Sequence, residues 1–89
     1  MSAYLNINPS VVYKLFLEEL TNTSNTYNLQ NFDTWNAYVD NGNAIFNVDA
    51  QANVNAAVGY SLGTNMRINS SVQITCGTTD KVIVSGITR

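Results

Sequence analysis

The chain has 89 residues, a formal net charge of −2, one cysteine and no histidine. This length fits a single domain spanning residues 1–89 with a modest core, which self-association would help to stabilise. The four basic residues are scattered along the chain, and this argues against nucleic acid as a partner because phosphate binding needs clustered lysine and arginine.

The composition offers few groups for catalysis. Absence of histidine removes the commonest general base and metal ligand, and no nucleophile motif or glycine-rich phosphate loop occurs. Five of the six carboxylates are accounted for by solvation and by turn capping. Asp49 lies on the polar face of a predicted hairpin, where ligand-rich spacing for a cation is absent. Cys76 falls on an apolar position. We therefore predict that the chain is not an enzyme and has no catalytic residue, no cofactor and no metal site.

The first element that the pattern predicts is a helix over about residues 9–21. Asn8 is a suitable N-cap, and Pro9 fits the first helical position because its missing N–H would be unpaired there anyway. Val12, Phe16 and Leu20 recur at a spacing of four, as on one side of a helix. We expect neither a targeting segment nor a membrane partner, because no basic start and no run of about 18 apolar residues is present.

Residues 22–33 are rich in asparagine and threonine. These side chains compete with the backbone for hydrogen bonds and favour turns. We predict a polar loop here, followed by antiparallel strands over residues 34–88.

The strand region carries a clear period of two. From Phe46 to Cys76, most even-numbered residues are apolar or small and most odd-numbered ones are polar, as in strands with one buried face. Asn41-Gly42 predicts a two-residue hairpin that sets Val39 opposite Ala44. Gly63-Thr64-Asn65 predicts a second hairpin, with Leu62 opposite Met66.

Two segments of the strand region leave alternatives open. The alternation from Ala44 to Leu62 is too long for one ordinary strand, so it either bends near residues 50–53 or projects as a ribbon. The final strand, over residues 81–85, is apolar without alternation. Such a strand is either covered on both faces or used in a subunit contact.

These elements predict an α+β fold, with one N-terminal helix packed on a four- to five-stranded antiparallel meander. The alternative is a small all-β barrel or sandwich in which the helix closes one end.

For function, the leading hypothesis is a non-enzymatic structural subunit that self-assembles, such as a virion coat, cement, tube or fibre component. Only 11% of the residues are charged, against the usual quarter, and neutral polar surfaces associate without repelling copies of themselves. Its partners would be copies of itself and other structural proteins, and it would be made in a host cytoplasm and carried in the virion. The subunit contacts are predicted on the last strand and the apolar side of the helix, at Val82, Ile83, Val84, Phe16, Leu17 and Leu20.

Two other classes of function compete with this one. A small monomeric protein-binding inhibitor or adaptor is the alternative, although the scarcity of charge gives it little electrostatic steering toward a partner. A membrane-inserting β-pore would also show the alternation, but Ser70 interrupts the band that would face lipid.

Overall fold

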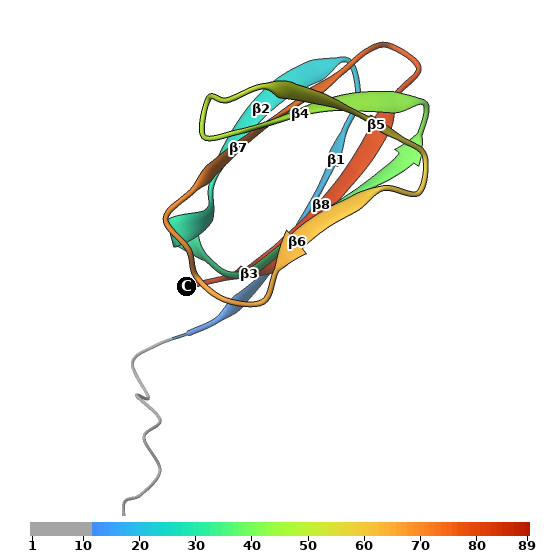
Figure 1. Cartoon of the computed structure of the whole chain (residues 1–89). Coiled ribbons are helices and arrows are strands. Elements are labelled where there is room, and N and C mark those ends of the chain that lie inside the picture. The colour runs from blue at the N-terminus through green and yellow to red at the C-terminus, as the bar shows by residue number, and fades with distance from the viewer. Residues whose placement is uncertain (1–11) are drawn as a thin grey trace, which may run out of the picture.

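The computed structural model describes residues 12–89, and nearly all its regular structure is β-strand (Figure 1). A single turn of 3-10 helix, η1 (Leu29–Asn31), is the only helical element among these residues. The strands are β1 (Lys14–Leu20), β2 (Thr23–Asn28), β3 (Phe32–Asn41), β4 (Asn43–Val48), β5 (Asn53–Ala57), β6 (Ser61–Thr64), β7 (Ser71–Cys76) and β8 (Lys81–Thr88).

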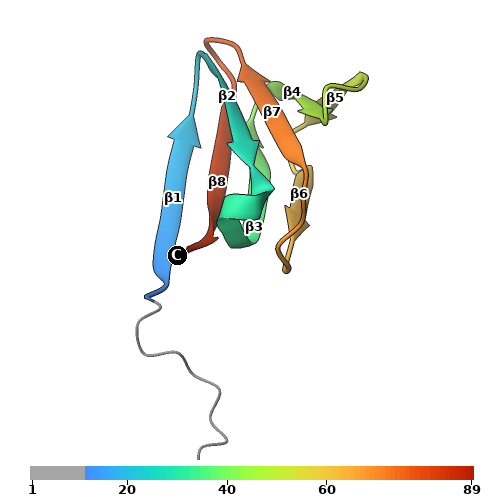
Figure 2. The same cartoon turned by 90° about the vertical axis from the view of Figure 1, so that its left-hand side faces the viewer.

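The strands form two four-stranded antiparallel sheets that pack face to face. One sheet has the order β1-β8-β3-β6 and the other the order β2-β7-β4-β5. Apart from the local pair β4 and β5, each strand lies in the opposite sheet to the strand before it, so the chain passes repeatedly across the sandwich (Figures 1 and 2). Eight strands in this order make a jelly roll.

The core lies between the two inner faces. Trp35, Ala37 and Val39 point inward from β3, and Val82 and Val84 do so from β8. The opposite sheet contributes Ala44, Phe46, Ala56, Val72, Ile74 and Cys76. At one end of the sandwich, aromatic rings form a cluster in which three pairs meet edge to face and the pair of Tyr27 and Trp35 is tilted. Edge-to-face geometry stabilises by about 0.5–1.5 kcal/mol per pair beyond burial alone. The rings of that cluster belong to Phe16, Tyr27, Phe32 and Trp35.

The prediction of a helix over residues 9–21, and with it the α+β fold, was wrong. Residues 14–20 form β1, which pairs with β8 from Lys14↔Thr88 to Leu20↔Val82, while residues 9–11 lie outside the described part of the chain. Inward Phe16 and outward Leu17 are both apolar, so the period of two is hidden and the spacing imitates a helix. The alternative sandwich is the observed architecture, without the helix that was expected to close it.

The polar loop predicted over residues 22–33 was also wrong in most of its length. Residues Thr23–Asn28 form β2, which pairs with β7, and β3 already begins at Phe32. Alternate side chains of β2, from Ser24, Thr26 and Asn28, face water, and the Ser24 and Thr75 hydroxyls pair at 3.1 Å across the two strands. A ladder of backbone hydrogen bonds does not need apolar residues, so composition alone concealed the strand.

Neither predicted hairpin forms, and the strands are therefore not a meander. The predicted turn needs positive φ at both Asn41 and Gly42. Gly42 has it, at +69°, but Asn41 does not, and the chain crosses there from one sheet to the other. Gly63 and Thr64 lie within β6, and Leu62 is opposite Ala37 of β3 rather than Met66.

The remaining two segments are now defined. Asp49 and Ala50 both have positive φ and turn the chain between β4 and β5, so the long alternating stretch bends and does not project. The strand that starts at Lys81 is confirmed and continues to Thr88. It lies between β1 and β3, where both of its faces are partly or fully covered, and this position explains its continuous apolar character.

Candidate functional site

An apolar surface covers the outer face of the sheet around β1 and β8. It contains two apolar pairs in the strand register, Leu15 with Ile87 and Ile83 with Tyr38. Ser85 lies between these pairs on β8 and faces Leu17. Leu15 is 90% exposed and Leu17 is 76% exposed. We refer to Leu15, Leu17, Tyr38, Ile83 and Ile87 as the outer apolar face. No described segment of the chain covers its two leucines.

Strand β1 is also an open edge of its sheet. Within residues 12–89 its only strand neighbour is β8, so the backbone groups on its other side have no strand to pair with. Figure 2 shows β1 at the margin of the molecule, beside β8. Soluble proteins usually protect such an edge with charges, proline or a bulge, and an apolar edge invites pairing with another strand.

The inward side of β1 is held in place by hydrogen bonds from β2. The Tyr27 hydroxyl and the Asn25 amide both donate to Glu18 Oε1. Burial, and then the hydrogen bond to Glu18, raise the pKa of the Tyr27 hydroxyl well above its usual value. Tyr27 therefore remains a proton donor, and the Glu18 carboxylate has a fixed position beside the open edge.

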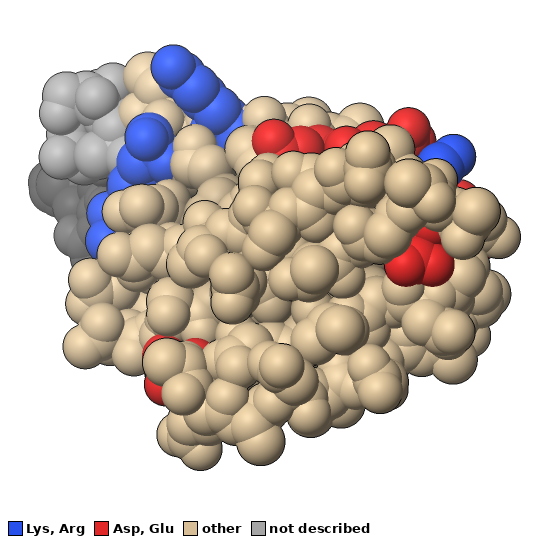
Figure 3. Space-filling model, turned by 90° about the horizontal axis from the view of Figure 1, so that it is seen from above, with Lys and Arg blue, Asp and Glu red and all other residues tan. Residues whose placement is uncertain are grey.

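Charge is sparse and local over the rest of the surface. Figure 3 shows one face of the molecule, on which charged side chains occupy only a few separated places. On the outer side of β1, Glu19 pairs with Lys81 at 3.6 Å. Elsewhere the Asp33 carboxylate forms ion pairs with Arg67 at 2.7 Å and with Arg89 at 3.1 Å. The hydrogen bond from Arg67 is the main cause of the lowered pKa of the Asp33 carboxyl.

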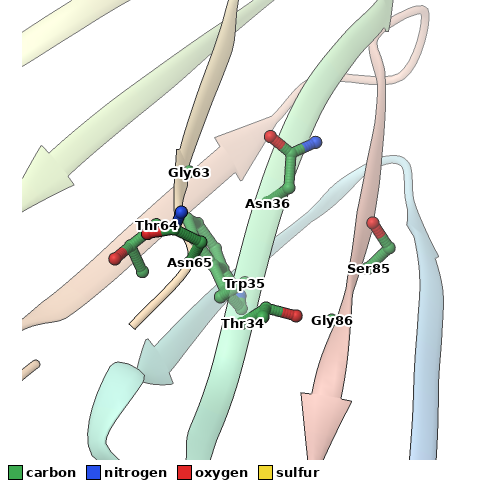
Figure 4. Close-up of a pocket in the computed structure, with 8 residues that line it drawn as sticks. All are labelled: Thr34, Trp35, Asn36, Gly63, Thr64, Asn65, Ser85 and Gly86. Carbon is green, nitrogen blue, oxygen red and sulfur yellow. The ribbon is translucent and has the colours of Figure 1, made fainter. Parts of the chain in front are cut away.

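A shallow polar groove of about 540 Å³ adjoins the outer apolar face. It lies over β6, β3 and β8, as Figure 4 shows. Gly63 and Gly86 approach β3 so closely there that an added Cβ atom would collide with it. Its polar lining consists of Thr34, Asn36, Thr64, Asn65 and Ser85. Because no ionisable residue lines it, the groove offers hydrogen-bond donors and acceptors but no acid or base.

A smaller cavity of about 100 Å³ lies between the sheets. It is mostly apolar, with Trp35, Leu62 and Val72 among its lining residues. The Trp35 indole N–H is buried and has no hydrogen-bond partner among the described residues. Ser70 and Thr64 are the polar residues at this cavity, and neither has an acid or base beside it in the lining.

The groups that most often carry catalysis or bind metals are dispersed. Among residues 12–89, no group of three or more His, Cys, Asp and Glu side chains is placed to hold a metal ion. Cys76 is buried, and desolvation raises the pKa of its thiol, so the nucleophilic thiolate is disfavoured. Within the same residues, no helix has the length and hydropathy that crossing a membrane requires.

The six predicted contact residues fall into two groups. Val82, Val84 and Leu20 lie in the core of the chain, and Phe16 packs against that core from the inner side of β1. Leu17 and Ile83 lie together on the outer apolar face. Sequence reasoning missed Leu15, Ile87 and Tyr38. Reading residues 14–20 as a strand would have found Leu15, because it then shares the outward side with Leu17.

Comparison with known proteins gives the fold and no family. No family model and no curated protein matches the chain. Among solved structures, the EutQ protein of Clostridium difficile is similar, with a TM-score of 0.57 and 18% sequence identity. The match covers 85% of this chain but only 56% of that protein, so the chain spans little more than half of its length. At this identity the likeness bears on the architecture of the strands alone.

Proposed function

We propose that the chain is a structural subunit that assembles with copies of itself, as a coat, cement, tube or fibre component of a virion. The single observation that carries this proposal is the pair of leucines, Leu15 and Leu17, exposed on an open edge strand. Ile87 lies opposite Leu15, and Ile83 and Tyr38 add a second apolar pair on the same face. Exposed apolar groups gathered on one face mark sites of association.

The composition supports self-association over recognition of a charged partner. Only 11% of the residues are charged, and asparagine, threonine and serine supply most of the polar surface. Two copies of such a surface approach each other with little electrostatic repulsion and little cost of removing ions from water. Jelly rolls also occur in viral capsids, although this fold hosts lectins and other binding proteins as well and supports the virion role by analogy only.

The test is the mass in solution, measured by light scattering after size exclusion over a hundredfold range of concentration. We expect a mass that is a multiple of 9.7 kDa, or one that rises with concentration. Leu17→Asn should shift the chain toward the monomer. Val58→Asn is the matched control, because Val58 is 56% exposed but follows β5, at the opposite margin of the sandwich.

Two results would overturn the proposal. A wild-type chain that stays at 9.7 kDa throughout does not assemble by itself, and the outer apolar face would then serve a different protein, as in an inhibitor or adaptor. Equal weakening by both substitutions would show that association is non-specific. Intrinsic fluorescence of Trp35, which is 1% exposed, verifies that each variant is folded.

A further inference from the structure

We propose that two copies pair through β1, antiparallel and about a twofold axis at Phe16, so that their sheets become one continuous sheet. This inference rests on the proposed self-assembly and specifies its first contact. Each copy contributes four strands, from β6 at the far margin to β1 at the junction. A twofold contact is self-complementary by symmetry, so β1 must match its own sequence read backwards.

On the outer face, this register pairs the exposed leucines. When Phe16 is opposite the partner's Phe16, Leu15 is opposite the partner's Leu17, and symmetry repeats the pair. Directly opposed side chains of an antiparallel pair have Cβ atoms about 4.5–5.5 Å apart, close enough for apolar contact. The two most exposed leucines of the described chain, at 90% and 76%, are then both covered.

On the inner side, the same register pairs opposite charges. Lys14 is opposite the partner's Glu18, and this pair is also repeated by the twofold axis. Lys14 is exposed, whereas Glu18 is half-buried and held in place by Tyr27 and Asn25. The carboxylate is therefore already positioned at the edge to receive the partner's ammonium group.

Other registers do not match. With the axis at Leu17, Leu15 is opposite the partner's Glu19, and Lys14 is opposite an apolar residue, Leu20. With the axis at Glu18, two carboxylates oppose each other. An axis midway between two residues shifts the pairing by one residue. It sets outward side chains against inward ones, because the period of a strand is two. Only the axis at Phe16 sets leucine opposite leucine and lysine opposite glutamate.

A charge exchange tests this register. Lys14→Glu alone, and Glu18→Lys alone, each make both charge pairs repulsive in a twofold dimer of the variant. We expect the dissociation constant of each variant to rise at least roughly tenfold, since two cross-strand pairs are reversed at once. An equimolar mixture of the two variants should restore association, because both pairs are attractive in the mixed dimer.

Three measurements control the exchange. Asp40→Lys reverses an exposed charge on β3 and should leave the dimer unchanged. Glu18→Gln keeps an acceptor for the Tyr27 hydroxyl and removes only the charge, so it should weaken the dimer less than Glu18→Lys. Light scattering of each variant and of the mixture gives the masses, and thermal unfolding confirms that each variant is folded.

A disulfide test covers the case in which Glu18→Lys does not fold. Leu15→Cys and Leu17→Cys change only exposed side chains, and Cys76 is buried. When the two variants are mixed and oxidised, we expect a crosslink between residues 15 and 17 of different copies, identified by mass spectrometry. Its absence from an associating mixture would overturn the pairing of β1.

The outcomes separate this inference from the proposed function. If the wild-type chain associates but the charge variants behave like it and gain nothing on mixing, self-assembly stands and the β1 register is wrong. If the wild-type chain is monomeric at every concentration, self-assembly itself is wrong. If each charge variant by itself associates weakly and the mixture of the two associates again, the result supports both self-assembly and the β1 register.

Discussion

Asp33 joins distant parts of the chain through its two arginine partners. It lies near the start of β3, while Arg67 precedes β7 and Arg89 follows β8. The Arg67 hydrogen bond, assisted by Arg89, lowers the pKa of the Asp33 carboxyl below its ordinary value of 3.8. This cluster therefore couples folding to pH in the acid range.

We predict that acidification lowers the free energy of unfolding more for wild type than for Asp33→Asn. The pKa of Asp33 is lower in the folded chain, so as the pH falls the unfolded chain binds the proton first. The contribution of the Asp33 carboxylate to the free energy of unfolding is present above about pH 4. It is lost as the pH falls through the folded-state pKa. Urea denaturation between about pH 2 and 6 measures the free energy of unfolding. Asp40→Asn, at an exposed carboxylate, corrects for a lost negative charge. A difference between wild type and Asp33→Asn that is constant with pH would contradict this account.

The corner between β3 and β4 depends on Gly42. This residue has a φ of +69°, and a Cβ atom added to it would collide with Asp80. The Asp80 carboxylate accepts the backbone N–H of Asn43 at 2.9 Å and that of Gly77 at 2.8 Å, so it ties the corner to the turn before β8.

We predict that Gly42→Ala lowers the free energy of unfolding by about 2 kcal/mol or more. Strain at positive φ costs roughly 1–3 kcal/mol, and displacement of Asp80 adds to it. Gly59→Ala is the matched control, because Gly59 has a φ of +95° but open space where its Cβ would lie. Chemical denaturation should show the smaller loss for Gly59→Ala. Equal losses would mean that the contact with Asp80 has no part in the effect.

The same corner shows how far the sequence leads at the level of elements. The Asn-Gly pair predicts positive φ at both of its residues, which holds at Gly42 and fails at Asn41. The period of two correctly places Phe46 and Ile74 on a buried face. The strand pairing was not predicted correctly. Strand β3 pairs with β8 and β6, and β4 pairs with β7 as well as β5. In a jelly roll most partners are distant in sequence, so turn chemistry fixes a local bend without fixing which strands meet.

The candidate site was found only in part for a related reason. An edge strand with apolar residues on both sides has no polar face to reveal its period, and β1 therefore imitates a helix. Leu17 and Ile83 were predicted from apolar character alone and do lie on the outer apolar face. Val82 and Val84 share that character and lie in the core, because composition does not tell which side of a central strand faces inward.

At the scale of the whole molecule, the open edge links association to stability. A chain of 89 residues buries a limited core, and an association that occurs only in the folded state adds to its stability by mass action. Leu15 and Leu17 stay exposed when the single chain folds, and pairing of β1 in the proposed dimer removes them from water.

We therefore predict that the melting temperature of the wild-type chain rises with its concentration, by a few degrees for each tenfold increase above the dissociation constant. Leu17→Asn should lose this dependence while it keeps a melting temperature close to that of dilute wild type, because Leu17 is 76% exposed in the single chain. Val58→Asn should keep the full dependence. Differential scanning calorimetry over a hundredfold range of concentration measures all three slopes. A flat wild-type slope, in the concentration range where light scattering finds an oligomer, would mean that association does not stabilise the folded chain against its unfolded state. The contact would then involve segments that associate equally well when unfolded, and an ordered edge such as β1 would not be responsible for it.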